Sequence, residues 1–125
     1  LDPEKLKSRL ESYSLPGVSF RTIYFKPFSG SQKGQLVKGL QYFFTDYESA
    51  RITETQLYVM KAVAEHYLDK KAFEIISGYG LFDKVCGTDY VRTEFQKRYD
   101  FTDIKDYWRK DEEAFRELSQ RYYIY

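Results

Sequence analysis

The sequence has 125 residues, of which 42% are hydrophobic and 31% are charged, a composition typical of one folded domain rather than a disordered chain. The formal net charge of +1 provides no strong attraction to nucleic acid or to an anionic membrane, and no apolar run approaches the roughly 18–20 residues of a membrane-spanning helix. The single cysteine excludes an internal disulfide, and one cysteine with one histidine argues against a zinc site of the usual ligands. Neither a metal nor a cofactor is expected. The unusual feature is the aromatic content of 19%, most of it tyrosine and phenylalanine.

The first 45 residues are expected to form a helix followed by a β-hairpin. Residues 2–4 (Asp-Pro-Glu) combine a capping carboxylate, a first-turn proline and an acid, which together favour a helix start. The Leu-Pro-Gly turn at 15–17 ends that helix. Apolar residues then alternate with a period of two in 18–25 and again in 36–45, which predicts two strands. Both faces of this hairpin carry aromatic residues, so we expect other structure to cover part of each.

The rest of the chain is expected to be helical. Thr53 and Gln56 match a capping box and predict a helix start at that point. The Ser-Gly-Tyr-Gly segment at 77–80 is expected to break the chain, and Thr88 and Thr102 are expected to cap later helices. The predicted class is therefore α+β: a small antiparallel sheet, packed with several helices of which the longest is C-terminal.

The C-terminal helix carries apolar residues at intervals of three, four or seven. This spacing predicts that Trp108, Phe115 and Leu118 belong to the core. Tyr122, Tyr123 and Tyr125 lie at or beyond the end of the helix, where periodicity no longer decides their environment.

The residues that could carry chemistry are few. The sequence has no glycine-rich phosphate loop, no nucleophile elbow and no metal-spaced cluster. His66 is expected on the surface near a helix end, and Cys86 is expected to be a buried, inert thiol. Asp46 follows the second strand and Asp89 follows Gly-Thr, where each could face a cleft. A local role is favoured for both: an Asx turn or helix cap for Asp46, and a favourable first-turn charge for Asp89.

Four segments occur in the order found in one bacterial protein family: LPGVSFRTIYFKP, KGQLVKGLQYFFTD, LFDKVCGTD and YWRKDEEAFRELSQRYYIY. On these segments the chain resembles the C-terminal domain of the exo-β-N-acetylmuramidases of peptidoglycan recycling, long known only as a domain of unknown function. The resemblance implies that residues 1–125 are a single accessory domain, following a Rossmann-like N-terminal domain that holds the main catalytic residues. It also implies a periplasmic or secreted glycoside hydrolase that removes terminal N-acetylmuramic acid from cell-wall fragments. The chain starts at Leu1 without methionine, so we expect it to be a piece of a longer protein that ends at Tyr125.

The family pattern is matched residue by residue at Phe25, Pro27, Gly34, Gly39, Gln41, Thr45, Asp46, Arg51, Phe82, Gly87, Thr88 and Asp89. The resemblance implies a substrate cleft near the junction of the two domains and no catalytic residue in this chain. The candidate cleft residues are Gln41, Phe43, Asp46, Arg51 and Asp89.

The chain also departs from the family pattern. Many members have histidine at the position of Phe43 and cysteine at the position of Val37. If that histidine contacts substrate, Phe43 implies a changed pocket, a different sugar preference or no activity. Aromatic side chains suit the apolar faces of pyranose rings, and the Phe43 departure together with the many aromatic residues motivates the alternative of a non-catalytic binding module.

The expected partners are the N-terminal domain of the same protein and a muropeptide or amino-sugar substrate. Tyr122, Tyr123 and Tyr125 are assigned to inter-domain packing, because chain termini stay ordered only when other structure holds them. Two alternatives to the accessory role stay open. One is a non-catalytic module that binds peptidoglycan, a sugar or a protein, and the other is an appendage that only stabilises its neighbour.

Overall fold

The structure is a computed structural model that describes residues 1–75 and 80–124. These residues form two compact units, one over residues 1–75 and one that begins after them. The first unit contains α1 (Pro3–Ser12), β1 (Val18–Phe25), β2 (Val37–Phe44), α2 (Ile52–His66), η1 (Leu68–Lys70) and α3 (Ala72–Ile75). The second contains α4 (Gly80–Cys86), α5 (Tyr90–Arg98), η2 (Phe101–Asp103), α6 (Lys105–Arg109) and α7 (Glu112–Gln120). Within the described ranges, no helix has the length and apolar character needed to cross a membrane.

The two strands pair as an antiparallel hairpin, which confirms the predicted α+β class. The first strand occupies the predicted residues 18–25, and the second is one residue shorter at each end than predicted. Val18 lies opposite Phe44, and Phe25 lies opposite Val37. Because side chains alternate across a strand, this register determines which residues share each face of the hairpin.

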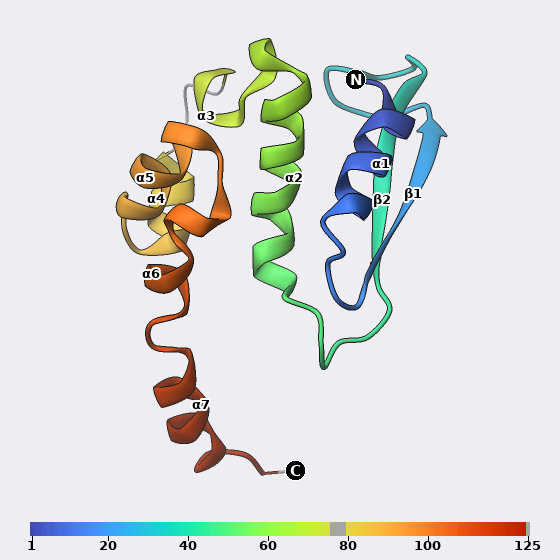
Figure 1. The fold of residues 1–125 in the computed structure, drawn as a ribbon. Helices are drawn as coiled ribbons and strands as arrows, with labels where there is room; N and C mark the ends of the chain where they lie inside the picture. The colour runs from blue at the N-terminus through green and yellow to red at the C-terminus, as the bar shows by residue number, and fades with distance from the viewer. Residues whose placement is uncertain (76–79, 125) are drawn as a thin grey trace. The chain divides into compact units, whose positions relative to one another are not determined.

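The core of the first unit lies between one face of the hairpin and the two helices α1 and α2 (Figure 1). Asp2 caps α1 as predicted, since its side chain accepts hydrogen bonds from the backbone N–H groups of Glu4 and Lys5. The residues buried together are Leu6 and Leu10 of α1, Phe20 of β1 and Ala62 of α2. Leu40, Val59 and Val63 pack around them.

A glycine joins the end of α1 to the end of the hairpin. Gly17 has a φ of +64°, and a Cβ atom there would lie 2.3 Å from the carbonyl oxygen of Asp46. Its own carbonyl oxygen accepts a hydrogen bond of 2.8 Å from the backbone N–H of Thr45. The predicted turn therefore needs glycine for both its conformation and its close contact with the loop after β2.

A polar cluster connects α1 to α2 at the solvent side of this core. The Nε and Nη2 atoms of Arg9 donate to the carboxylate of Glu65 at 2.6 and 2.9 Å, and the Tyr13 hydroxyl donates to the same carboxylate at 2.8 Å. The hydrogen bond from Arg9 lowers the pKa of Glu65, while burial raises the pKa of Tyr13.

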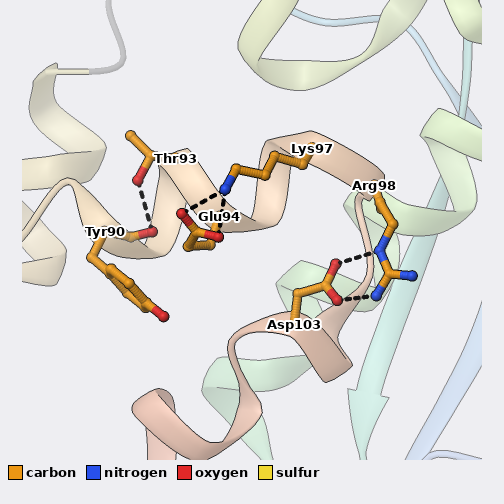
Figure 2. A network of polar contacts seen from close by, with 6 residues as sticks. All are labelled: Tyr90, Thr93, Glu94, Lys97, Arg98 and Asp103. Carbon is orange, nitrogen blue, oxygen red and sulfur yellow. Dashed lines mark hydrogen bonds and ion pairs between the residues drawn. The ribbon is translucent and has the colours of Figure 1, made fainter.

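The second unit is held at the end of α5 by polar contacts between nearby residues (Figure 2). Lys97 pairs with Glu94 along the helix, and the guanidinium of Arg98 donates through two nitrogens to the carboxylate of Asp103 in η2. Tyr99, with a φ of +53°, follows Arg98 as the residue that ends α5. The buried side chains of this unit are Val91, Phe95, Tyr99, Phe101 and Ile104.

Two of the predicted helix caps are wrong. The helix near Thr53 begins at Ile52 with Arg51 at the cap position, and that cap has no side-chain hydrogen bond. Thr102 lies inside η2, where the carboxylate of Asp100 accepts a hydrogen bond from the backbone N–H of Thr102. In each case an earlier residue, and not the threonine, occupies the N-cap position. The Thr88 prediction is closer, because its hydroxyl accepts a hydrogen bond from the N–H of Tyr90.

The C-terminal helical stretch runs from Lys105 to Gln120, divided at residues 110–111 into α6 and α7. The longest uninterrupted helix is α2, with 15 residues. Trp108 is half-buried, but Phe115 and Leu118 are 69% and 48% exposed, so their assignment to the core is wrong. Helical periodicity shows which side chains share a face and contains no information about what lies against that face. Of the predicted break at 77–80, residues 77–79 lie outside the described residues, and α4 begins at Gly80.

Candidate functional site

The face of the hairpin that points away from the core is the strongest candidate for a binding site. Phe20 is buried, so the alternate residues of β1 and their partners in β2 form the opposite surface. We call this surface the outer hairpin face; its residues are Ser19, Arg21, Ile23, Phe25, Val37, Gly39, Gln41 and Phe43. Phe25 and Phe43 are 48% and 40% exposed, so this face presents two aromatic rings to solvent.

An arginine, a glutamine and a phenylalanine meet at the centre of this face. Arg21 lies directly opposite Gln41 in the strand register, and its Nη2 donates a hydrogen bond of 2.6 Å to Gln41 Oε1. The guanidinium carbon of Arg21 lies 5.4 Å from the centroid of the Phe43 ring, within the range of a cation–π contact. The cross-strand pair and its diagonal neighbour therefore hold the arginine side chain across the sheet.

Sequence reasoning selected Gln41 and Phe43 but missed Arg21. The signal was present, because Arg21 alternates with the buried Phe20 along the first strand. Only the antiparallel register places it opposite Gln41, so the sequence pattern had to be combined with strand pairing to find it.

The chemistry available on the outer hairpin face is binding rather than proton transfer. Its eight residues include no carboxyl, imidazole or thiol side chain. Arg21 and Gln41 supply N–H donors, and the phenylalanine rings supply apolar planes. The face is therefore suited to a ligand that combines a flat apolar surface with hydrogen-bond acceptors.

The other two candidates from this region lie after β2, in the loop that leads to α2. Both carboxylate oxygens of Asp46 are engaged locally, in a 3.0 Å bond from the Glu48 N–H and a 2.7 Å bond from the Ser49 hydroxyl. These hydrogen bonds lower the pKa of Asp46, with the Ser49 hydroxyl contributing most. The Asx-turn interpretation is confirmed, and a carboxyl held ionised in a turn is poorly suited to donate a proton. Arg51 is exposed at the cap position of α2.

The candidates in the second unit show no catalytic arrangement. Asp89 is exposed at the cap position of α5, where its side chain makes no capping hydrogen bond. Cys86 is half-buried rather than buried as predicted, and this partial burial raises the pKa of its thiol, as expected for an unreactive cysteine. An open groove of about 470 Å³ lies beside it, lined in part by Tyr107, Trp108 and Asp111.

His66 lies at a helix end as predicted, but it is less exposed than the sequence suggested. It ends α2 and is half-buried, and its Nε2 atom is enclosed without a hydrogen-bond partner among the residues that the structure describes. No group of three or more histidine, cysteine or acidic residues suitable for a metal occurs in the described part of the chain.

The end of the chain presents a second exposed apolar surface. α7 buries none of its side chains, and the turn after it leaves Tyr122 and Tyr123 75% and 62% exposed. The Tyr123 hydroxyl lies 3.1 Å from the Ser119 hydroxyl, which holds one ring against the helix. We call Phe115, Leu118, Tyr122 and Tyr123 the α7 apolar face; Tyr125 lies outside the described residues.

Comparison with known proteins gives consistent matches over all or nearly all of the chain. A family model described as "Exo-beta-N-acetylmuramidase NamZ, C-terminal" matches residues 1–125. The sequence is 32% identical over 121 residues to the peptidoglycan beta-N-acetylmuramidase NamZ of Bacillus subtilis (strain 168), covering 97% of this chain and 28% of that protein. The fold is similar to the crystal structure of a DUF1343 family protein from Bacteroides fragilis NCTC 9343, with a TM-score of 0.92 and 38% identity over all of this chain and 33% of that one. The chain therefore spans about a third or less of the length of these relatives.

Proposed function

From the premise that the chain belongs to the family of NamZ C-terminal domains, we propose that it is the accessory domain of a peptidoglycan-processing glycoside hydrolase. The enzyme would remove terminal N-acetylmuramic acid from cell-wall fragments, and this domain would help to form the substrate cleft. We further propose that residues 1–125 act as one domain beside a Rossmann-like catalytic domain, in a periplasmic or secreted protein.

The observation that carries this proposal is the composition of the outer hairpin face. It offers exposed aromatic rings and oriented N–H donors but no acid or base, which suits a surface that binds sugar while another domain does the chemistry. Gln41 and Phe43 are the cleft residues that this arrangement favours. Asp46, Arg51 and Asp89 remain candidates on the family pattern alone.

The α7 apolar face is a second observation that supports the proposal of a neighbouring domain. Its exposed aromatic rings are the kind of surface that packs against protein, and the matched relatives have about two thirds or more of their length beyond the matched region. We propose that Tyr122, Tyr123 and Tyr125 pack against that domain.

The test is an assay of the full-length protein on a muramic-acid-terminated disaccharide. We expect release of muramic acid, and we expect Phe43→Ala to lower kcat/KM by about 2- to 10-fold, the effect of losing one aromatic contact. The matched control is Phe28→Ala, which removes a ring that is 92% exposed in the connection between the strands. No release by the wild-type protein would reject the hydrolase, and equal effects of the two variants would reject Phe43 as a cleft residue.

The groove beside Tyr107 and Trp108 gives a specific reason to keep the alternative of a self-sufficient binding module. Titrating the isolated chain with muropeptides separates the two functions. Tight binding without the rest of the protein favours the module, whereas binding only by the full-length protein favours a shared cleft.

A further inference from the structure

Arg21 differs from several other arginines of the chain because its described contacts include no carboxylate. Ion pairs with carboxylates hold Arg9, Arg92, Arg98 and Arg116. Arg21 has no such pair among the described residues, and its neighbours on the outer hairpin face are a neutral amide and a phenyl ring. Its positive charge is therefore available to an anionic ligand.

The guanidinium is also oriented rather than free to move. The hydrogen bond to Gln41 uses one of its five N–H groups, and the contact with Phe43 restricts the plane of the group. The remaining N–H groups make no hydrogen bond within the described residues. An arginine held in this way loses less conformational freedom on binding and can present two parallel donors to one planar acceptor.

We propose that Arg21 recognises a carboxylate of the bound cell-wall fragment, while the adjacent Phe43 ring lies against the apolar face of the sugar that carries it. This proposal rests on the proposed function, and it assigns recognition of the acidic sugar to one residue, Arg21. N-acetylmuramic acid carries a carboxylate on its lactyl ether, and N-acetylglucosamine carries none. Recognition by Arg21 therefore lets the domain distinguish the two sugars of the wall.

A single arginine favours a carboxylate over a phosphate at this position. Arg21 is the only charged side chain among the eight residues of the outer hairpin face. One planar fork matches the charge and the two oxygens of a carboxylate, whereas phosphate sites commonly combine several donors and cations. The carboxylate has two sources: the lactyl group when it is free, or the peptide stem when the lactyl group is amide-linked to it.

The test measures binding to the full-length protein, so that it does not depend on turnover. Three ligands are titrated: N-acetylmuramic acid, its lactyl methyl ester, and a disaccharide-peptide in which the lactyl group is amide-linked. The variant is Arg21→Gln, and the matched control is Lys38→Gln. Lys38 lies on the same hairpin but on its other face, with its Nζ 6.0 Å from the Tyr24 ring, so both variants lose one positive charge.

We expect wild-type protein to bind an acid ligand more tightly than its uncharged analogue. Arg21→Gln should weaken binding of that acid by about 10- to 100-fold, as for loss of a hydrogen-bonded charge pair. Arg21→Lys should recover part of the loss, and Lys38→Gln should leave the acid-to-ester ratio unchanged. A loss confined to the free sugar acid identifies the lactyl source, and a loss confined to the disaccharide-peptide identifies the stem.

Two results overturn the inference without touching the proposed function. One is equal wild-type affinity for the acid and the ester together with no effect of Arg21→Gln on the disaccharide-peptide. The other is an equal loss for every ligand in Arg21→Gln, which would show a structural role. Thermal unfolding of each variant is measured as well, to detect variants that fail to fold. The comparison of acid and ester affinities in the wild type does not depend on any variant. The proposed function fails separately, if the wild-type protein releases no muramic acid.

Discussion

Helices α1 and α7 have similar length and the same kind of amphipathic pattern, but they differ in how their apolar faces are used. α1 has ten residues and lies beside the hairpin and α2 (Figure 1). It buries Leu6 and Leu10 against them. α7 has nine residues, and its Phe115 and Leu118 stay exposed. The contrast shows that an apolar stripe predicts a surface that needs a partner, while the location of that partner has to be found separately.

The largest effect should come from the covered helix. Leu10→Ala removes a side chain that is 1% exposed, and it should lower the free energy of unfolding by about 2–5 kcal/mol because it leaves a cavity between α1, β1 and α2. Chemical denaturation of the isolated chain measures this loss. A loss below about 1 kcal/mol would mean that α1 is not packed as the structure describes and would remove the contrast with α7.

A smaller effect is expected at the polar edge of the same helix. The pKa of Glu65 is lowered in the folded state, mainly by the hydrogen bond from Arg9, so the ionised carboxylate stabilises the fold. That contribution is fully present above the ordinary pKa of the carboxyl group and is lost as the pH falls through the lowered value. Glu65→Gln should therefore reduce stability at neutral pH and weaken the pH dependence in the acid range.

Thermal unfolding between pH 3 and pH 7 measures this dependence. The control is Glu11→Gln, which removes an acid of α1 that pairs only with Lys7 in the described structure, 3.4 Å away. Identical pH profiles for the two variants would contradict a special role for the Arg9–Glu65–Tyr13 cluster.

The smallest effect on the isolated chain should come from the uncovered helix. Phe115→Ser combined with Leu118→Ser should change the free energy of unfolding by no more than about 0.5 kcal/mol per site, because both side chains are already exposed. The same double variant should destabilise the full-length protein, if the α7 apolar face meets another domain. Gln120→Ser, at an exposed position of α7, is the control for helix propensity. Equal stability of the full-length variant and wild type would contradict the packing role.

Predictions succeeded where the cause lies within a few residues. The period of two located both strands, Asp2 was identified as a cap, and Asp46 was interpreted as a turn former. The caps at Thr53 and Thr102 failed because a neighbouring residue took the cap position, and local patterns do not rank such competitors. For the candidate site, Gln41 and Phe43 were found by family pattern, but Arg21 became visible only through the strand register.

The sequence by itself determined the hairpin, the start of α1 and the division of each strand and helix into two faces, because these depend on backbone preferences and on side chains close in the chain. The tertiary structure decided which faces are covered, since burial depends on segments that are distant in sequence. It buried Leu10 of α1, left Phe115 of α7 exposed, and brought the guanidinium of Arg21 to Gln41 and Phe43 of the facing strand. The proposed carboxylate site follows from that last contact, because hydrogen-bonding and ring contacts across two strands orient a charge that a single strand leaves free to move.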